Sequence, residues 1–228
     1  MKNFDKSIRS CFDTLESMEL LAQAGPGCSL RASDSFKKAS LRARSYREVY
    51  DSGVINQDFN IMLSDHSFFQ FTLQENGDIR LAFYPNPYKF VEFLDYKRDA
   101  LSLLENQELT HEEYSQLLSE AEFSGDIPAI RYDYSLEQYC ENYHPAAHFH
   151  IGFFADNRWP TKRILTPYAF LLKILRHYYL KFWIKILDTS EASSQDKLDE
   201  IYRNEVSNCP LLDENNFSQK EEERLHFL

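Results

Sequence analysis

The sequence predicts an α+β fold: a small, mostly antiparallel sheet of four to five strands covered by helices, with an N-terminal helical segment and an acidic C-terminal helical tail. Three observations support this prediction. Several segments repeat apolar residues every three or four positions, which is the helical period. Other segments alternate apolar and polar residues, which is the period of a strand. The segments follow one another as helix, helix, hairpin, helices, strand, strand and helix, so helices are expected to cover one face of the sheet.

The first elements are two helices and a hairpin. Residues 2–22 have apolar side chains at spacings of three and four, which predicts an amphipathic helix that ends at the following Ala-Gly-Pro-Gly sequence. A second helix is expected over residues 36–50. The runs 69–74 and 79–83 then alternate, and the Asn-Gly-Asp sequence between them is a strong hairpin signal.

Helical patterning returns over residues 88–122. We expect two helices there, broken near Asn106, with Thr110 beginning a capping box for the second. Two further strands are predicted at 130–134 and 147–153 because apolar and polar residues alternate in both.

The last long helix begins at Thr166 as N-cap and Pro167 as first helical residue, and it is expected to run to about Leu187. The chain from residue 189 onward contains ten acids and four bases, and a capping box at Ser218 predicts a short final helix. The predicted domains are therefore a single α+β domain over residues 1–188 and an acidic helical tail over 189–228, packed on or near that domain.

Composition excludes several classes of protein. Hydrophobic residues make up 43% and aromatic residues 15% of the chain, which is too rich in packing groups for a disordered protein. The four cysteines form no CxxC pair, so neither a zinc ribbon nor a disulfide framework is indicated. The first residues resemble no secretory signal, and basic residues interrupt the most apolar window, so we expect a cytoplasmic protein without a membrane span.

A titratable cluster is predicted on the last two strands. Strand side chains alternate between faces, so Arg131 and Asp133 share one face of the first strand. On the second strand, His148, His150 and Gly152 share a face. The opposite face is expected to hold Phe149, Ile151 and Phe153. If the apolar faces of the two strands align, the charged residues and the histidines lie on one common surface.

This cluster is compatible with two kinds of chemistry. Without a metal ion, His148 and His150 would act as acid and base, Asp133 would orient them, and Arg131 would stabilise negative charge on a phosphate. With a divalent metal ion, the ligands would be His144, His148, His150 and Asp133. A polar strand face that is merely solvated or packed is the third interpretation. No cofactor is expected, although a divalent metal remains open.

Charge is segregated along the chain. The formal net charge is −11, yet residues 157–187 contain seven bases and no acid, and residues 31–47 contain six bases and one acid. Such basic regions can bind nucleic acid in an otherwise acidic protein. The residues predicted to bind a nucleic-acid backbone are Lys162, Arg163, Lys173, Arg176, His177 and Lys181. The four of these that lie on the last long helix, from Lys173 to Lys181, would form one stripe. Alternatively, the acidic tail covers this basic helix.

Three short motifs resemble a known family. They are RxD at residues 131–133, HPxxHxH at 144–150 and RIxTP at 163–167. Together they resemble a family of uncharacterised bacterial proteins, the domain of unknown function numbered 2290. The resemblance implies that the cluster residues are the hallmark of that family, and it implies no activity.

These observations predict a nuclease, namely a metal-independent endoribonuclease of bacterial toxin or phage-defence type that uses a two-histidine site. The expected partner is nucleic acid, with RNA favoured over DNA. One alternative is a non-enzymatic interaction subunit of a defence or toxin–antitoxin system, which would bind an acidic partner or antitoxin protein. The other is a metal-dependent phosphohydrolase. A steep salt dependence of nucleic-acid binding would distinguish a nucleic-acid reader from an interaction subunit.

Overall fold

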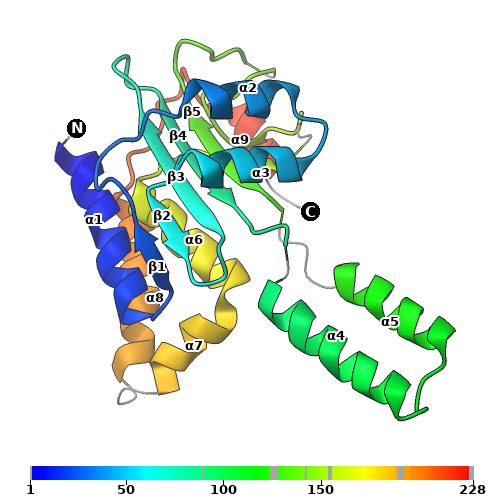
Figure 1. The fold of residues 1–228 in the computed structure, drawn as a ribbon. Helices are drawn as coiled ribbons and strands as arrows, with labels where there is room; N and C mark the ends of the chain where they lie inside the picture. The colour runs from blue at the N-terminus through cyan, green and yellow to red at the C-terminus, as the bar shows by residue number, and fades with distance from the viewer. Residues whose placement is uncertain are drawn as a thin grey trace.

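The fold is built on one open antiparallel sheet (Figure 1). The computed structural model describes residues 2–88, 90–123, 128–141, 143–153, 156–188 and 193–225. Each strand pairs with its neighbour in sequence, in the order β1-β2-β3-β4-β5-β6-β7. The strands are β1 (Leu21–Ala24), β2 (Ile61–Leu63), β3 (Phe68–Leu73), β4 (Ile79–Tyr84), β5 (Ile130–Tyr134), β6 (Ala147–Ile151) and β7 (Trp159–Pro160).

The α+β class is therefore confirmed, but the predicted strand number is wrong: the described chain has seven strands in place of four to five. The three missed strands are short, with four residues in β1, three in β2 and two in β7. Runs this short carry little alternation, so a sequence pattern cannot reveal them. β1 was also absorbed into the predicted helix 2–22, because apolar Leu21 continues the helical spacing.

The helices follow the chain in the order seen in Figure 1. They are α1 (Lys2–Ser17), α2 (Asp34–Arg42), α3 (Tyr46–Ile55), α4 (Phe90–Glu105), α5 (His111–Phe123), α6 (Pro167–Tyr178), α7 (Leu180–Asp188), α8 (Ser193–Asn208) and α9 (Gln219–Leu225). Among the described helices, none is both long and apolar enough to cross a membrane.

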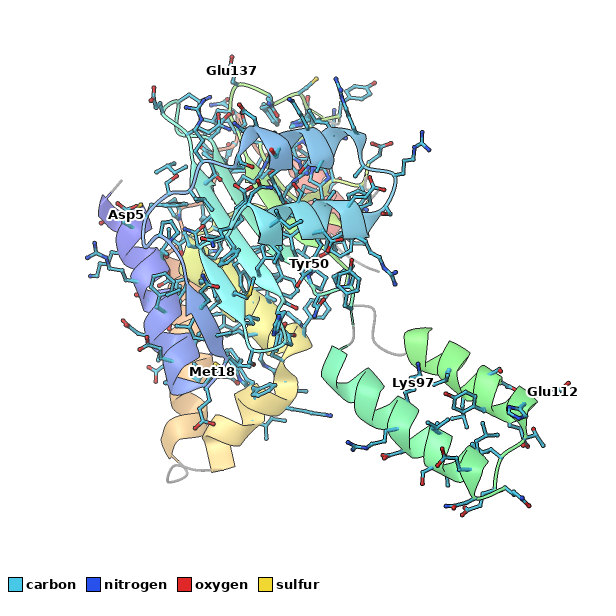
Figure 2. The ribbon with its side chains drawn as sticks, viewed as in Figure 1. Asp5, Met18, Tyr50, Lys97, Glu112 and Glu137 are labelled. Atoms are coloured by element: carbon cyan, nitrogen blue, oxygen red, sulfur yellow. The ribbon has the colours of Figure 1, made fainter. Side chains whose placement is uncertain are left out.

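Helices cover both faces of the sheet, which corrects the expectation of one covered face. Apolar side chains of α1, α6 and α8 pack with Phe71 and Tyr132 in the larger core. On the opposite face, α2 and α3 pack with Phe68 in a second core. Figure 2 shows side chains, including Tyr50, filling the space between α3 and the strands. We call the face under α2 and α3 the second face.

Two predicted helices are each divided in two. The helix expected over 36–50 is α2 followed by α3, because Ala43 adopts extended backbone angles at the end of α2. The helix expected from 167 to 187 is broken at Tyr179, between α6 and α7. The Tyr179 hydroxyl donates to Asp65 Oδ2 at 2.7 Å, so its side chain is tied to the loop between β2 and β3. No glycine or proline marks this break in the sequence.

Several local predictions are confirmed. β3 and β4 form the predicted hairpin, with Phe71 paired to Leu81. Thr110 Oγ1 accepts from the Glu113 backbone N–H at 3.2 Å, while Glu113 Oε2 accepts from the Thr110 N–H at 2.8 Å, which is a reciprocal capping box. The Thr166 hydroxyl accepts from Ala169 N at 3.0 Å and caps α6.

Helices α4 and α5 pack against each other as an antiparallel pair. Figure 2 places Lys97 of α4 and Glu112 of α5 away from the sheet. The break between them falls near Asn106, as the sequence predicts.

Candidate functional site

The register of β5 and β6 brings the predicted cluster together. Arg131 pairs with His150, and Asp133 pairs with His148. All four side chains lie on the second face, since Tyr132 between them belongs to the larger core on the other side. The arrangement therefore agrees with the strand alternation of the sequence.

His148 is buried and neutral. The residue is only 1% exposed, and its Nδ1 donates to the Pro145 carbonyl at 2.9 Å. Burial, followed by the charge of His150, lowers the pKa of His148 to about 4. Because a carbonyl oxygen can only accept, the proton of neutral His148 is on Nδ1 and the lone pair is on Nε2.

His150 faces that lone pair. The two Nε2 atoms are 3.0 Å apart, so His150 Nε2–H donates to His148 Nε2. The same His150 nitrogen is 3.6 Å from Asp133 Oδ2. His150 thus lies between a neutral imidazole and a carboxylate, and its side chain is 8% exposed.

Asp133 is held by two arginines. Arg80 Nε donates to Oδ1 at 3.0 Å and Arg131 Nε donates to Oδ2 at 2.8 Å. Burial alone would raise the pKa of Asp133, but the charges of Arg80 and Arg131 lower it below its usual value. The carboxylate is therefore ionised at neutral pH and joins both guanidinium groups to the histidine pair.

Arg80 is a site residue that the sequence reasoning missed. It pairs with Asp133 across β4 and β5, so it lies in one row with His148. A signal was present, because alternation in residues 79–83 puts Arg80 on the polar face. The pairing of this strand with β5 could not be read from the sequence, since residues 85–129 separate the two strands.

Three groups could together hold a metal ion. Ligand atoms of Asp133, His148 and His150 all lie within 4.8 Å of one another. The Pro145 carbonyl on Nδ1 of His148 is the kind of outer partner that orients a metal ligand. His144, the fourth predicted ligand, lies outside this group, although its ring packs edge-on against His148 at 4.9 Å.

The charges at this group oppose a cation. Both Asp133 oxygens already accept from guanidinium groups, so two positive charges face one negative charge. A divalent cation would have to bind beside these two guanidinium groups and also displace the proton between the imidazoles. The site is thus better matched to an anion such as a phosphate.

The basic residues of α6 are not brought to this cluster. Lys173 Nζ lies 5.8 Å from the ring centre of Phe149, whose side chain is on the opposite side of β6 from His148 and His150. Arg176 is 3.6 Å from Asp199 of α8. The predicted stripe of Lys173, Arg176, His177 and Lys181 is therefore separated from the histidines by the sheet, and the break at Tyr179 divides it.

Lys162 and Arg163 are engaged by the C-terminal segment. Lys162 Nζ donates to Glu222 Oε1 at 2.9 Å, and Arg163 donates to the carbonyls of Ser207 and Cys209, each at 2.9 Å. Together with the Arg176–Asp199 pair, these contacts favour the alternative in which the acidic segment covers basic residues. Partly exposed pairs of this kind contribute little stability individually.

The end of β6 differs from the expected alternation. The strand ends at Ile151, and Gly152 adopts φ +97°, which side chains disfavour. The chain turns there, so the Phe153 ring packs at 5.8 Å from Tyr46 of α3 on the second face. Phe153 was expected to share the face of Phe149, and this expectation is wrong.

The chain matches one family model over residues 19–227, described as an uncharacterized conserved protein (DUF2290). The match begins after α1 and contains all of the residues of the cluster. No curated protein and no solved structure matches the chain.

Proposed function

The chain belongs to the DUF2290 family of uncharacterized conserved proteins, and we propose that it is a ribonuclease that cleaves RNA without a metal ion. The observation that carries this proposal is the chain of contacts from two guanidinium groups through Asp133 to a hydrogen-bonded histidine pair. It combines groups that bind a phosphate with groups that move a proton.

The arginines supply the phosphate site. The side chains of Arg80 and Arg131 are 51% and 39% exposed, so their guanidinium groups reach solvent while Nε contacts Asp133. A guanidinium has five N–H donors in a planar fork, and each contact with Asp133 uses one nitrogen. The remaining donors suit a phosphodiester and would stabilise the charge that develops during its cleavage.

The histidine pair supplies the proton transfer. The 2′-hydroxyl of the RNA attacks phosphorus, the bond from phosphorus to the 5′-oxygen breaks, and a 2′,3′-cyclic phosphate forms. The pair takes the proton of the 2′-hydroxyl and returns one to the 5′-oxygen, so no net proton is consumed. His150 would be the catalytic residue because it is nearer to solvent, while His148 positions it through the shared hydrogen bond.

This chemistry favours RNA over DNA. DNA has no 2′-hydroxyl, so its cleavage needs an external nucleophile, which nucleases commonly obtain from metal-bound water. The positive charge around Asp133 opposes such a metal ion. RNA instead carries its own nucleophile next to each phosphate.

The test is cleavage of a single-stranded RNA by the purified protein with and without a chelator. We expect cleavage in both conditions, and a loss of about a hundredfold or more in His150→Ala. His111→Ala, at an exposed histidine of α5, is the matched control and should cleave like the wild type. Equal cleavage by His150→Ala would refute the role given to the histidine pair. No cleavage by the wild type would refute the proposal and favour a non-enzymatic interaction subunit.

A metal-dependent phosphohydrolase is the second candidate, favoured by the grouping of Asp133, His148 and His150 ligand atoms within 4.8 Å. In that case the three residues would hold the metal and a bound water would attack phosphorus. Metal analysis of the purified protein tests this directly. The second candidate would replace the first if the wild type held one equivalent of metal that His148→Ala lacked, and if a chelator abolished cleavage.

A role as a bacterial toxin or phage-defence effector stays a prediction. It implies that cleavage harms the cell that makes the protein. Induced expression in a bacterial host should then arrest growth, and His150→Ala should relieve the arrest at equal protein level. Growth unaffected by the wild type would contradict this role without affecting the proposed chemistry.

A further inference from the structure

The helices that cover the second face carry a basic surface that has no role in the proposed function so far. It consists of exposed bases in and around α2 and at the start of α3, namely Arg31, Lys37, Lys38, Arg42, Arg44 and Arg47. We call it the α2–α3 basic surface. It contrasts with the basic residues of α6, which lie across the sheet from the histidines.

We infer that the α2–α3 basic surface binds the backbone of single-stranded RNA and leads it to the histidine pair. The inference rests on the proposed function, because it supplies the docking surface for that same site. It replaces α6 as the expected nucleic-acid surface.

The first argument is availability. Lys38, Arg42 and Arg44 are exposed, and none of their side chains forms an ion pair with a residue that the structure describes. In contrast, Arg176 pairs with Asp199 and Lys162 pairs with Glu222. A base without a protein carboxylate can exchange bound anions for RNA phosphates, and the release of counterions drives such binding.

Among the described residues, the acids on this surface form an ion pair with only one of its bases. Asp34 contacts Lys37 at 3.4 Å, which occupies one base. The carboxylate of Glu48 is turned to the start of α3, where it accepts from the Ser45 hydroxyl at 3.2 Å and the Arg44 backbone N–H at 3.3 Å. Glu48 therefore caps a helix and does not neutralise a basic side chain.

The second argument is adjacency to the site. Phe36 of α2 packs edge-on against Tyr84 of β4 at 5.5 Å. Arg131 and Arg80 are close enough to Tyr84 that their charges oppose the effect of burial, which raises its pKa. On the other side, Tyr46 of α3 packs against Phe153, three residues beyond His150. Both helices thus contact residues at the end of a strand, or just beyond it, that carries the arginines or histidines of the site.

The third argument is a site at which a base could stack. The Arg47 guanidinium carbon lies 5.4 Å from the ring centre of Tyr88, which also packs at 6.1 Å from Tyr50. Single-stranded RNA is bound by combining cationic side chains with aromatic rings. A pair of this kind at the edge of the basic surface suits single-stranded RNA better than a rigid duplex.

The test compares two triple variants that remove the same charge from opposite faces. Lys38→Gln/Arg42→Gln/Arg44→Gln alters the α2–α3 basic surface. Its matched control is Lys6→Gln/Arg9→Gln/Arg203→Gln, at exposed bases of α1 and α8. The probe is a fluorescent 2′-O-methyl oligouridine, which the proposed chemistry cannot cleave, and its anisotropy is followed from 50 to 300 mM salt.

We expect the α2–α3 variant to bind about tenfold more weakly near 0.1 M salt, with a log–log salt slope reduced by roughly 2. The control variant should bind like the wild type, and circular dichroism should be unchanged in both. The inference would be overturned if the α2–α3 variant bound the probe as tightly as the wild type. It would also be overturned if the control variant lost as much affinity as the α2–α3 variant. Absence of wild-type binding would overturn it too. Because the probe is not cleaved, these outcomes are independent of whether His150 is catalytic.

Discussion

The Nε2 atoms of His148 and His150 face each other at 3.0 Å, although the two residues are only two positions apart on one strand. The Pro145 carbonyl fixes the proton of His148 on Nδ1, so its Nε2 accepts from His150. One backbone carbonyl thereby decides which imidazole is donor and which is acceptor. The following predictions test this arrangement and the packing that supports it.

The pH dependence of stability should report His148. Its pKa is lowered from 6.5 to about 4 in the folded protein, so between these values the unfolded chain binds a proton that the folded chain does not. Stability contributed by the neutral imidazole is complete above pH 6.5 and is lost as the pH falls toward 4. We expect a loss of about 2 kcal/mol over that window. Urea unfolding at a series of pH values measures it.

The matched variants for this measurement are His148→Asn and His111→Asn. Asparagine can keep the donation to Pro145 but does not titrate, so His148→Asn should show a shallower fall in stability below pH 6.5 than the wild type. His111→Asn, at an exposed position, should keep the wild-type slope. The account of His148 is wrong if both variants keep it.

Asp133→Asn should destabilise the protein by about 2 kcal/mol. The substitution removes the negative charge that both Arg80 and Arg131 contact, in a side chain only 17% exposed. Arg80→Gln should cost less than about 1 kcal/mol, because Arg80 is 51% exposed and its pair is screened. Chemical denaturation of both variants and their combination checks this order. Equal costs would contradict the central position given to Asp133.

Tyr132→Phe should cost about 1–2 kcal/mol. The Tyr132 hydroxyl accepts from the Leu165 N–H at 3.1 Å and donates to the Arg163 carbonyl at 3.0 Å, and Leu165 is buried. Phenylalanine leaves that N–H without an acceptor. Tyr134→Phe removes a hydroxyl with no hydrogen bond to a described residue, so thermal unfolding should show little change for it.

Gly53→Ala should destabilise the fold even though alanine favours helices. A Cβ at Gly53 in α3 would lie 2.5 Å from Phe68 Cζ and 3.0 Å from Phe36, so either these buried rings or the helix would have to shift. We expect a cost of about 1–3 kcal/mol. Ser35→Ala, at an exposed position of α2, should stay within about 0.5 kcal/mol. A stabilised Gly53→Ala would mean that α3 does not pack as closely as described.

Local signals predicted the hairpin, the helix caps at Thr110 and Thr166, and the common face of Arg131 and His150. Each depends on residues near one another in sequence or on the strict alternation of a strand. These signals remain valid wherever the rest of the chain folds. They account for the α+β class and for most of the cluster.

What the sequence could not predict depends on distant contacts. The break at Tyr179 coincides with its hydrogen bond to Asp65, more than a hundred residues earlier. The place of Arg80 in the site requires the pairing of β4 with β5, across the segment that contains α4 and α5. The side of the sheet on which α6 packs is likewise set by its apolar face meeting Phe71 and Phe149. This last contact is why the basic stripe and the histidines are apart.

The most direct test of the proposed function is the end group formed when the wild-type protein cleaves an RNA oligonucleotide in excess chelator. A single 2′-deoxy substitution at the cleaved position serves as the matched substrate. We predict a 2′,3′-cyclic phosphate in the ³¹P NMR spectrum, no cleavage at the 2′-deoxy position, and loss of the cyclic phosphate in His150→Ala. Cleavage next to the 2′-deoxy residue, or products that appear only when a divalent metal is restored, would contradict the account.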